Sequence, residues 1–357
     1  MLSKDKTLRS IEDLVAAGIL QADAEAGLRP VAERFAVGVS PQMTAVIRAG
    51  AEDGPVRRQF VPDRRELHVE PIERHDPIGD DAHSPSFGLV HRYPDRVLFK
   101  LVSVCPVYCR FCFRREMVGP DGDGAMSDDD IAAAVAYVRA RPAIREVILT
   151  GGDPFMLSAR RIGLVMAELN AIEHLDVIRW HTRVPVVAPE RVTDEFVAAV
   201  SGSEKTVVVA VHCNHADELT AAAVESLRML RRSGVTLVSQ TVLLKGINDT
   251  LPALETLMRA FLKLGVLPYY LHHGDLATGT SHFRTTLAEG LELVEALRGR
   301  LSGLAQPTYV LDLPGGAGKV PVTRELIAEG GVRTWTGDWY VYPPRVEHVA
   351  TASRERH

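Results

Sequence analysis

From Val97 onward, hydrophobic residues alternate between two patterns. Short apolar runs, typical of buried strands, are each followed by a longer stretch with apolar residues at helical spacing. The runs predict strands at Val97 to Val104, Glu146 to Leu149, Val177 to Trp180, Thr206 to Val211, Thr236 to Gln240 and Leu267 to Leu271. The helical pattern covers Asp128 to Arg139, Ala159 to Ile172, Ala216 to Arg232, Pro252 to Leu264 and Leu287 to Leu301. This alternation implies βαβ crossovers and an α/β fold whose parallel sheet is wide enough to curl into a partial or full barrel.

The chain before this region has a different pattern. Residues 1 to about 55 predict short helices, because Ser10 to Asp13 resembles a capping box and Leu28, Val31 and Phe35 recur at helical spacing. The stretch from Pro71 to Ser86 is rich in Pro, Asp, His and Gly and predicts a loop leading into the main domain.

Composition narrows the class of protein. The chain has 357 residues, 46% of them hydrophobic, and a net charge of -5, which gives no electrostatic case for nucleic acid or an anionic membrane. Charges interrupt every apolar run before it reaches the roughly 20 residues that a membrane span needs. With four cysteines and no export signal at the N-terminus, we expect a globular protein of the cytoplasm.

Polar residues stand where the predicted strands end. Cys105, Gly151, Thr182, His212 and Gln240 all fall at or near carboxyl ends of strands. In parallel barrels these ends form one face, and the chemistry lies there. The sequence therefore predicts that these residues converge.

Three of the four cysteines, Cys105, Cys109 and Cys112, are spaced C-x3-C-x2-C after the first apolar run. Three thiolates on one short loop can hold three irons of a four-iron cubane and leave the fourth iron open. A disulfide framework is disfavoured, since the remaining Cys213 is distant and offers no convincing pairing. A structural zinc site would need a fourth ligand near by. Zinc-bound cysteines and inert buried cysteines both stay open as less favoured interpretations.

This spacing resembles the signature of the radical S-adenosylmethionine (SAM) enzymes. Tyr108 and Phe111 stand where that superfamily has aromatic residues, and Gly151, Gly152 and Asp153 follow the next run, like its glycine-rich contact for the methionine amino group. The resemblance implies that the open iron chelates SAM, and that an electron from the cluster cleaves it to methionine and a 5′-deoxyadenosyl radical.

A second chemical stretch runs from Leu311 to Pro321 and contains a glycine-rich loop before Lys319. It is not a nucleotide P-loop, because Leu313 and Val320 occupy positions where that motif needs a glycine and a Ser or Thr. Such a loop can bring a lysine into a confined site. On residues alone, a surface turn with a solvated lysine remains open.

From about Arg92 to Pro321 the chain resembles the lysine 2,3-aminomutase family, in which a lysine after such a loop binds pyridoxal 5′-phosphate (PLP) covalently. Lys319 takes that position. Arg92, Tyr93 and Arg96 match the residues that hold the PLP phosphate, and Gln240 matches a further cofactor contact. A phosphate dianion favours guanidinium groups and a phenol hydroxyl. Without the resemblance, Arg92 and Arg96 read as solvated loop charges.

The resemblance also implies the substrate contacts. Arg114 matches the ligand of the substrate α-carboxylate, and Asp275 and Asp312 match the pair that holds the ε-ammonium of lysine. Two carboxylates favour one ammonium and repel glutamate. On residue type alone, Asp275 reads as a helix cap or turn residue. His212 resembles the contact to the SAM ribose; on residues alone it could equally be a hydrogen-bonded histidine at a strand end.

Together these implications describe a PLP-dependent isomerase that converts L-lysine to β-lysine by a 1,2-amino migration started by the 5′-deoxyadenosyl radical. An electron donor such as flavodoxin or ferredoxin would reduce the [4Fe-4S] cluster, and we expect a homo-oligomer. The expected organisation is an N-terminal helical region and loop at residues 1–90, a partial (βα)6-type TIM barrel at residues 91–302, and a C-terminal PLP-lysine segment and tail at residues 303–357.

The sequence departs from the classical family pattern in several places. Phe111 stands where those enzymes have a histidine, and their C-terminal cysteine-rich zinc segment is missing. We expect the tail, Trp335 to Pro344 and the charged residues to His357, to pack on a neighbouring subunit. The short length points to the branch that makes (R)-β-lysine for elongation factor P, whereas Asp312 points to the free-lysine enzymes. An aminomutase of glutamate or arginine, and a non-catalytic iron-sulfur or zinc scaffold, also stay open.

Overall fold

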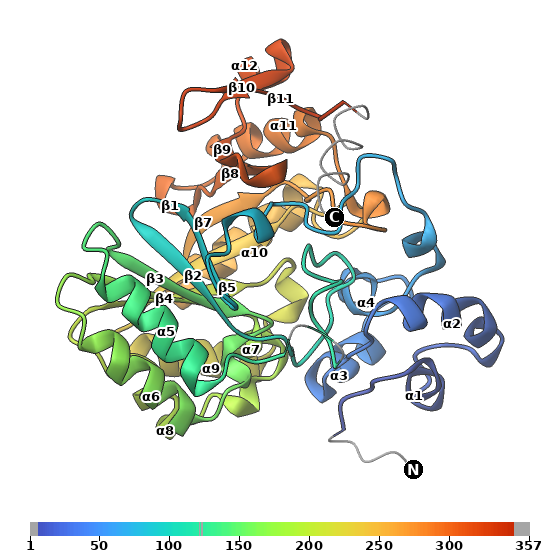
Figure 1. Cartoon of the computed structure of the whole chain (residues 1–357). Coiled ribbons are helices and arrows are strands. Elements are labelled where there is room, and N and C mark those ends of the chain that lie inside the picture. The colour runs from blue at the N-terminus through green and yellow to red at the C-terminus, as the bar shows by residue number, and fades with distance from the viewer. Residues whose placement is uncertain (1–5, 121, 123, 346–357) are drawn as a thin grey trace, which may run out of the picture.

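The computed structural model describes residues 6–120, 122 and 124–345. Its N-terminal part consists of short helices, as expected: α1 (Ile11–Ala16), α2 (Glu25–Arg34), α3 (Pro41–Ala49) and α4 (Pro55–Phe60). Ser10 begins α1, and its hydroxyl accepts a hydrogen bond of 3.1 Å from the backbone N–H of Asp13. Figure 1 shows these helices together on one side of the main domain.

The main domain is built on one sheet, which has nine strands among the described residues, paired in sequence order. The strands β2 to β8 run parallel, while β1 and β9 pair antiparallel at the two edges. Their bounds are β1 (Leu89–Tyr93), β2 (Arg96–Val102), β3 (Glu146–Gly151), β4 (Val177–Thr182), β5 (Thr206–His212), β6 (Thr236–Val242), β7 (Leu267–His272), β8 (Thr308–Leu313) and β9 (Gly318–Pro321). The six predicted strands are confirmed as β2 to β7, and the partial-barrel fold is confirmed with them.

Helices between successive parallel strands cover the outside of the sheet (Figure 1). Their bounds are α5 (Asp128–Arg139), α6 (Ala159–Asn170), α8 (Asp194–Ser201), α9 (Ala221–Arg232), α10 (Leu251–Leu264) and α11 (Leu287–Arg298). Each begins after a Ser or Thr whose hydroxyl accepts a hydrogen bond from a backbone N–H of the first turn. The sequence did not predict α8, nor the short buried α7 (Val184–Val187) before it.

The two edges of the sheet meet through one hydrogen bond. The backbone N–H of Lys319 in β9 donates to the Tyr93 hydroxyl at the end of β1 over 2.7 Å. The stretch read as a glycine-rich loop is in fact a hairpin, in which Asp312 of β8 lies opposite Lys319 of β9. Gly315 and Gly316 make its turn with φ of +73° and +82°, a region that favours glycine. The barrel is therefore closed on this side by the element that carries the predicted PLP lysine.

The C-terminal segment adds helix α12 (Arg324–Glu329) and a small two-stranded sheet, β10 (Gly331–Arg333) and β11 (Trp339–Val341). Part of the tail packs on its own chain: Tyr342 is buried, and the Tyr340 hydroxyl donates to the Pro314 carbonyl over 2.9 Å. Packing of the tail on a neighbouring subunit stays a prediction. The charged residues 346–357 of the predicted tail lie outside the described part of the chain.

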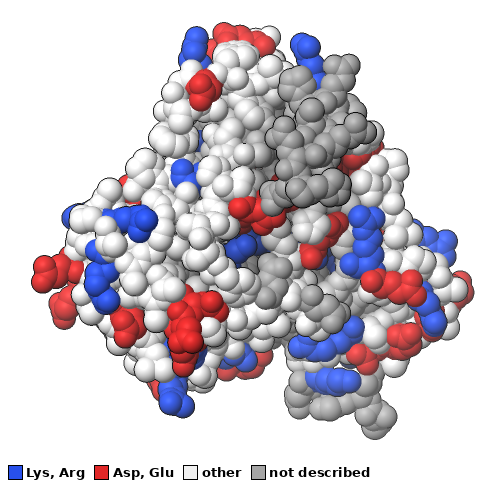
Figure 2. All heavy atoms as spheres, in the orientation of Figure 1, with Lys and Arg blue, Asp and Glu red and all other residues white. Residues whose placement is uncertain are grey.

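One hydrophobic core runs from Leu8 to Tyr342 and so includes residues of all three expected segments. On the face shown in Figure 2, acidic and basic side chains are interspersed. No helix in the described ranges is long and apolar enough to cross a membrane.

Candidate active site

A cavity of about 860 Å³ runs through the barrel, from the carboxyl ends of the parallel strands to residues that begin strands, such as Arg96 and Glu146. All of the residues predicted to bind a cluster, cofactor or substrate line it, and those at the carboxyl ends of strands converge as expected. They are Arg92, Tyr93, Arg96, Cys105, Cys109, Phe111, Cys112, Arg114, Gly151, Gly152, Asp153, His212, Gln240, Asp275, Asp312 and Lys319.

The three cysteines lie on the loop after β2, on one wall of this cavity. Burial raises the pKa of the Cys112 thiol to about 11 and raises those of Cys105 and Cys109 as well. Among the described residues, no group of three or more His, Cys, Asp or Glu side chains is placed to hold a metal ion. A cubane does not require such a group, because each thiolate binds its own iron. Three thiols facing a cavity are a donor set that fits a [4Fe-4S] cluster.

The glycines after β3 let the backbone come close to the cluster loop. Gly151 has a φ of +120°, and a Cβ there would overlap the carbonyl oxygen of Val102. A Cβ on Gly152 would overlap the carbonyl oxygen of Val104, one residue before Cys105. Only glycine fits at these positions, so the end of β3 packs directly against the backbone that leads into the cysteine loop.

Asp153 has a structural role that was not predicted from the sequence. Its buried carboxylate accepts four hydrogen bonds, from the Thr182 hydroxyl (2.7 Å) and from the backbone N–H groups of Phe155 (3.0 Å), Arg183 (2.7 Å) and Val184 (3.2 Å). These bonds fix the end of β4 next to the end of β3. Its contact to SAM stays a prediction.

Two buried histidines face the cavity at the ends of neighbouring strands. Burial lowers the pKa of His212 to about 3, partly opposed by a hydrogen bond with Gln240, and it lowers the pKa of His181 still more clearly. Their ring centroids are 6.0 Å apart. Both are thus neutral and can contact an uncharged hydroxyl. The sequence analysis missed His181, although Arg179 and His181 alternate with the buried Ile178 and Trp180, as inward and outward residues of a strand do.

Lys319 enters the cavity from β9 and forms an ion pair with Asp312 on the opposite strand. Its Nζ lies 3.3 Å from His272 Nδ1 and 5.3 Å from the ring centroid of Tyr270. Although burial alone would raise it, Lys319 and His272 hold the pKa of Asp312 well below its usual range. His272 and Tyr270, at the end of β7, were not predicted. Lys319 is therefore not a solvated surface lysine.

Asp275 has a buried Oδ1 and no ion pair among the described residues. Burial, reinforced by the charge of Asp312, raises its pKa to about 8. Its Oδ1 has no hydrogen-bond partner within the described part of the chain. An unpaired carboxylate in a low-dielectric site is costly unless a cation arrives to pair with it. This finding excludes the reading of Asp275 Oδ1 as a capping group.

One carboxylate that the sequence analysis did not single out orients two of the predicted arginines. Asp80 accepts from Arg92 over 3.0 Å with one oxygen, and from Arg114 over 2.8 and 3.1 Å with the other. The Asp80 side chain is only 2% exposed. Arg114 also donates to the Thr150 hydroxyl over 3.2 Å. The loop expected from Pro71 to Ser86 thus contributes directly to the site.

The other arginine of the predicted phosphate group is less enclosed. Arg96 pairs with Asp95 over 2.7 Å and stacks on the ring of Tyr93, with its guanidinium carbon 4.0 Å from the ring centroid. About a third of the Arg96 side chain (31%) is exposed, which places it at the rim of the cavity.

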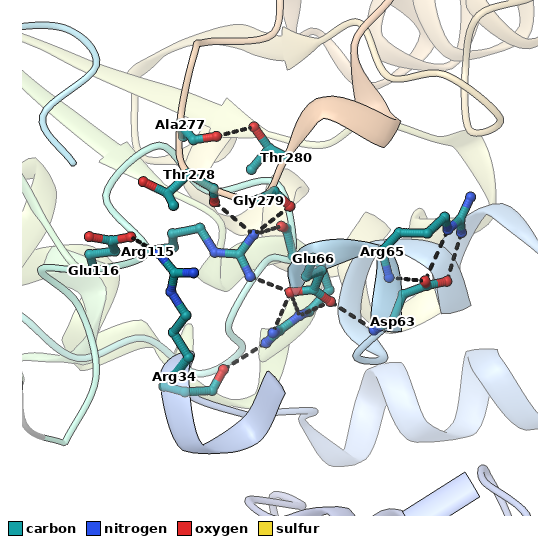
Figure 3. A network of polar contacts seen from close by, with 12 residues as sticks. Arg34, Asp63, Arg65, Glu66, Arg115, Glu116, Ala277, Thr278, Gly279 and Thr280 are labelled. Atoms are coloured by element: carbon teal, nitrogen blue, oxygen red, sulfur yellow. Dashed lines mark hydrogen bonds and ion pairs between the residues drawn. The ribbon is translucent and has the colours of Figure 1, made fainter. Parts of the chain in front are cut away.

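A buried ionic network joins the cluster loop to the N-terminal region (Figure 3). Both carboxylate oxygens of Glu66 accept hydrogen bonds from Arg110, at 2.6 to 3.1 Å. Glu66 also forms an ion pair with Arg115. Arg115 also donates to the carbonyl of Gly279 over 3.3 Å, and its guanidinium lies 3.5 Å from the ring centroid of Phe35. The arginines flanking the cysteines therefore anchor the loop from behind.

Comparison with known proteins agrees with this geometry. The family model "Radical SAM superfamily" matches residues 99–257, and the model "Lysine-2,3-aminomutase" matches residues 294–334. An L-lysine 2,3-aminomutase of Fusobacterium nucleatum is 38% identical over 320 residues, which is 90% of this chain and 75% of that protein. An L-lysine 2,3-aminomutase of Escherichia coli is 33% identical, over 86% of this chain and 90% of its own. A glutamate 2,3-aminomutase of Clostridioides difficile is 34% identical, over 87% of this chain and 74% of its own.

Proposed function

Because the chain belongs to the lysine 2,3-aminomutase family of radical SAM enzymes, we propose that it moves the α-amino group of L-lysine to the β-carbon and so forms β-lysine. The enzyme is an isomerase that uses a [4Fe-4S] cluster, SAM and PLP. When bound, the cluster with SAM supplies the radical, and PLP supplies the π system through which the nitrogen migrates.

The residues present fit these groups. The three thiols offer one ligand for each of three irons, and Gly151 and Gly152 line the same cavity beside them. Arg92 suits the PLP phosphate, because its Nε is buried without a partner among the described residues while Asp80 holds the other end of the guanidinium. Lys319 would hold PLP, and Arg114, fixed by Asp80 and Thr150, would hold the substrate α-carboxylate.

One observation carries the substrate assignment: Asp275 is buried and unpaired next to Asp312. Asp312 is neutralised by Lys319 in this structure. With its amine engaged in holding PLP, Lys319 would no longer offset the charge of Asp312, and the two carboxylates would together favour a cationic group. The ε-ammonium of lysine meets that need, whereas the side-chain carboxylate of glutamate would add a third negative charge.

The surrounding protein would keep the reacting centre dry and in place. The cavity lies in the barrel, between the cluster loop and the β8–β9 hairpin, and these two elements would hold the bound groups from opposite sides. A one-electron donor such as flavodoxin or ferredoxin would supply the electron. We place the enzyme in the cytoplasm, where reducing conditions preserve free cysteines, and expect a homo-oligomer.

The test is an anaerobic assay after reconstitution with iron, sulfide and PLP, with SAM, dithionite and either L-lysine or L-glutamate. We expect β-lysine, identified by chiral chromatography and mass spectrometry. Its enantiomer distinguishes the elongation factor P branch, which forms (R)-β-lysine, from the free-lysine enzymes. β-Glutamate as the main product would overturn the substrate assignment.

Asp275→Asn tests the role of the carboxylate pair. Removing one charged partner of the ammonium should raise KM for lysine about 10- to 100-fold, because hydrogen bonds to charged groups contribute roughly 1.5–3 kcal/mol. The exposed Asp23→Asn serves as the matched control and should leave KM unchanged. Equal KM values for Asp275→Asn and the wild type would contradict the assignment.

A further inference from the structure

A buried arginine with no part in the proposed reaction contacts one of the cluster cysteines. Arg183 follows β4, its side chain is 8% exposed, and one of its terminal nitrogens donates to Cys109 Sγ over 3.1 Å. The other terminal nitrogen donates to the Glu218 carboxylate and to the side-chain amide oxygen of Gln59, each over 2.6 Å. The guanidinium carbon lies 4.7 Å from the ring centroid of Phe60 and 5.6 Å from that of Phe111.

The partners of Arg183 are themselves held in place. Glu218 is fully buried, and its second oxygen accepts from the backbone N–H groups of Asn214 (2.9 Å) and His215 (2.8 Å) and from the Gln59 amide (3.0 Å). Because these contacts come from the N-terminal helices and from the segment after β5, the guanidinium cannot turn away from the sulfur. Packing of this kind positions a donor before a ligand binds.

We propose that Arg183 is a positioning residue that donates a charge-assisted hydrogen bond to the Cys109 thiolate and so raises the reduction potential of the iron-sulfur cluster. Reduction adds a negative charge to the cluster and its sulfurs. A cationic donor at one sulfur stabilises that charge, and low-dielectric surroundings strengthen the effect. The inference rests on the proposed function for the cluster but not on the identity of the substrate.

Glu218 gives the proposal a second, opposite prediction. Its carboxylate offsets part of the positive charge of Arg183 next to the sulfur. In Glu218→Gln the amide oxygen can still accept a hydrogen bond, but the negative charge is gone. The cluster should then be easier to reduce, whereas Arg183→Met should make it harder to reduce.

The experiment is a redox titration of the reconstituted cluster, followed by electron paramagnetic resonance, in the wild type and in the Arg183→Met, Arg183→Lys and Glu218→Gln variants. In Arg183→Met we expect the ratio of reduced to oxidised cluster at a fixed potential to fall about tenfold, which is about 59 mV for one electron. Arg183→Lys, which keeps the charge, should restore part of the shift, and Glu218→Gln should shift the potential upward.

Arg179→Met is the matched control. Arg179 lies on β4, the strand that Arg183 follows, and faces the same cavity, but its guanidinium is bound to Glu146 over 3.0 Å rather than to a sulfur. We expect the reduction potential of the cluster in Arg179→Met to equal that in the wild type. An equal shift in Arg179→Met, or an unshifted potential in Arg183→Met, overturns the inference. Should Arg183→Met take up no cluster, an unshifted Glu218→Gln potential overturns it. A wild-type protein that assembles no cluster overturns the proposed function itself.

Discussion

At the residue scale, Asp275 and Asp312 differ because only one of them has a cation. Asp312 is ionised beside Lys319, whereas burial and the neighbouring charge raise the pKa of Asp275 to about 8. An ammonium binds to the ionised carboxylate, and the ionised fraction of Asp275 grows as the pH rises to about 8. With Lys319 holding PLP, its charge no longer lowers this pKa, so the affinity for lysine should rise by about tenfold per pH unit across the range from pH 6 to 8.

Lysine binding measured by calorimetry across this range, on the anaerobic enzyme loaded with PLP and SAM, checks the prediction. Asp275→Asn should bind weakly with no such slope. A wild-type affinity that stays constant between pH 6 and 8 would contradict the raised pKa as the cause.

The residues that could be predicted from the sequence are those with a spacing or a resemblance behind them, such as the three cysteines and Lys319. Asp80 could not, because an acidic residue in an Asp-rich loop carries no periodic signal; its role depends on Arg92 and Arg114, which lie at other places in the chain. The role of Arg183 was not predicted from the sequence, for a similar reason. Its three partners come from segments that only the fold brings together.

At the scale of elements, the cluster loop is held by the buried network around Glu66. Replacing Glu66 with Gln leaves Arg110 and Arg115 buried without their counter-charge, and loss of one partner of a buried ion pair costs about 3–5 kcal/mol. We expect the free energy of unfolding in urea to fall by about that amount. Glu70→Gln, at a half-exposed side chain near by, should change it by less than about 0.5 kcal/mol.

Elements with a regular apolar pattern were predicted closely, and α5 was predicted with its observed bounds. The β8–β9 hairpin was not predicted, because the Pro and Gly residues between Asp312 and Lys319 indicate a loop. The register of its two strands also depends on partners across the sheet, which the local sequence does not reveal. The short helix α7 was not predicted, because the apolar run Val184–Val187 is too short to show a helical period of hydrophobic residues.

At the scale of the whole molecule, the β8–β9 hairpin closes the barrel against β1 through the hydrogen bond from the Lys319 N–H to the Tyr93 hydroxyl. Tyr93→Phe removes that acceptor, so the amide hydrogen of Lys319 should exchange faster with solvent, and stability should fall by about 1 kcal/mol. Hydrogen exchange on the protein without PLP measures this directly. Tyr137→Phe, whose hydroxyl contacts His91 instead, should leave the Lys319 amide unchanged.

The position of the β8–β9 hairpin late in the chain also determines when the two sides of the cavity are translated. The cysteine loop leaves the ribosome long before Lys319, which follows about 200 residues later. At about 5–20 residues per second, on the order of 10 to 40 seconds separate the two. Until the end of that interval the nascent barrel lacks the complete β8–β9 hairpin. The wall of the cavity that carries the PLP lysine is therefore the last to be translated, and the side facing it stays accessible until then.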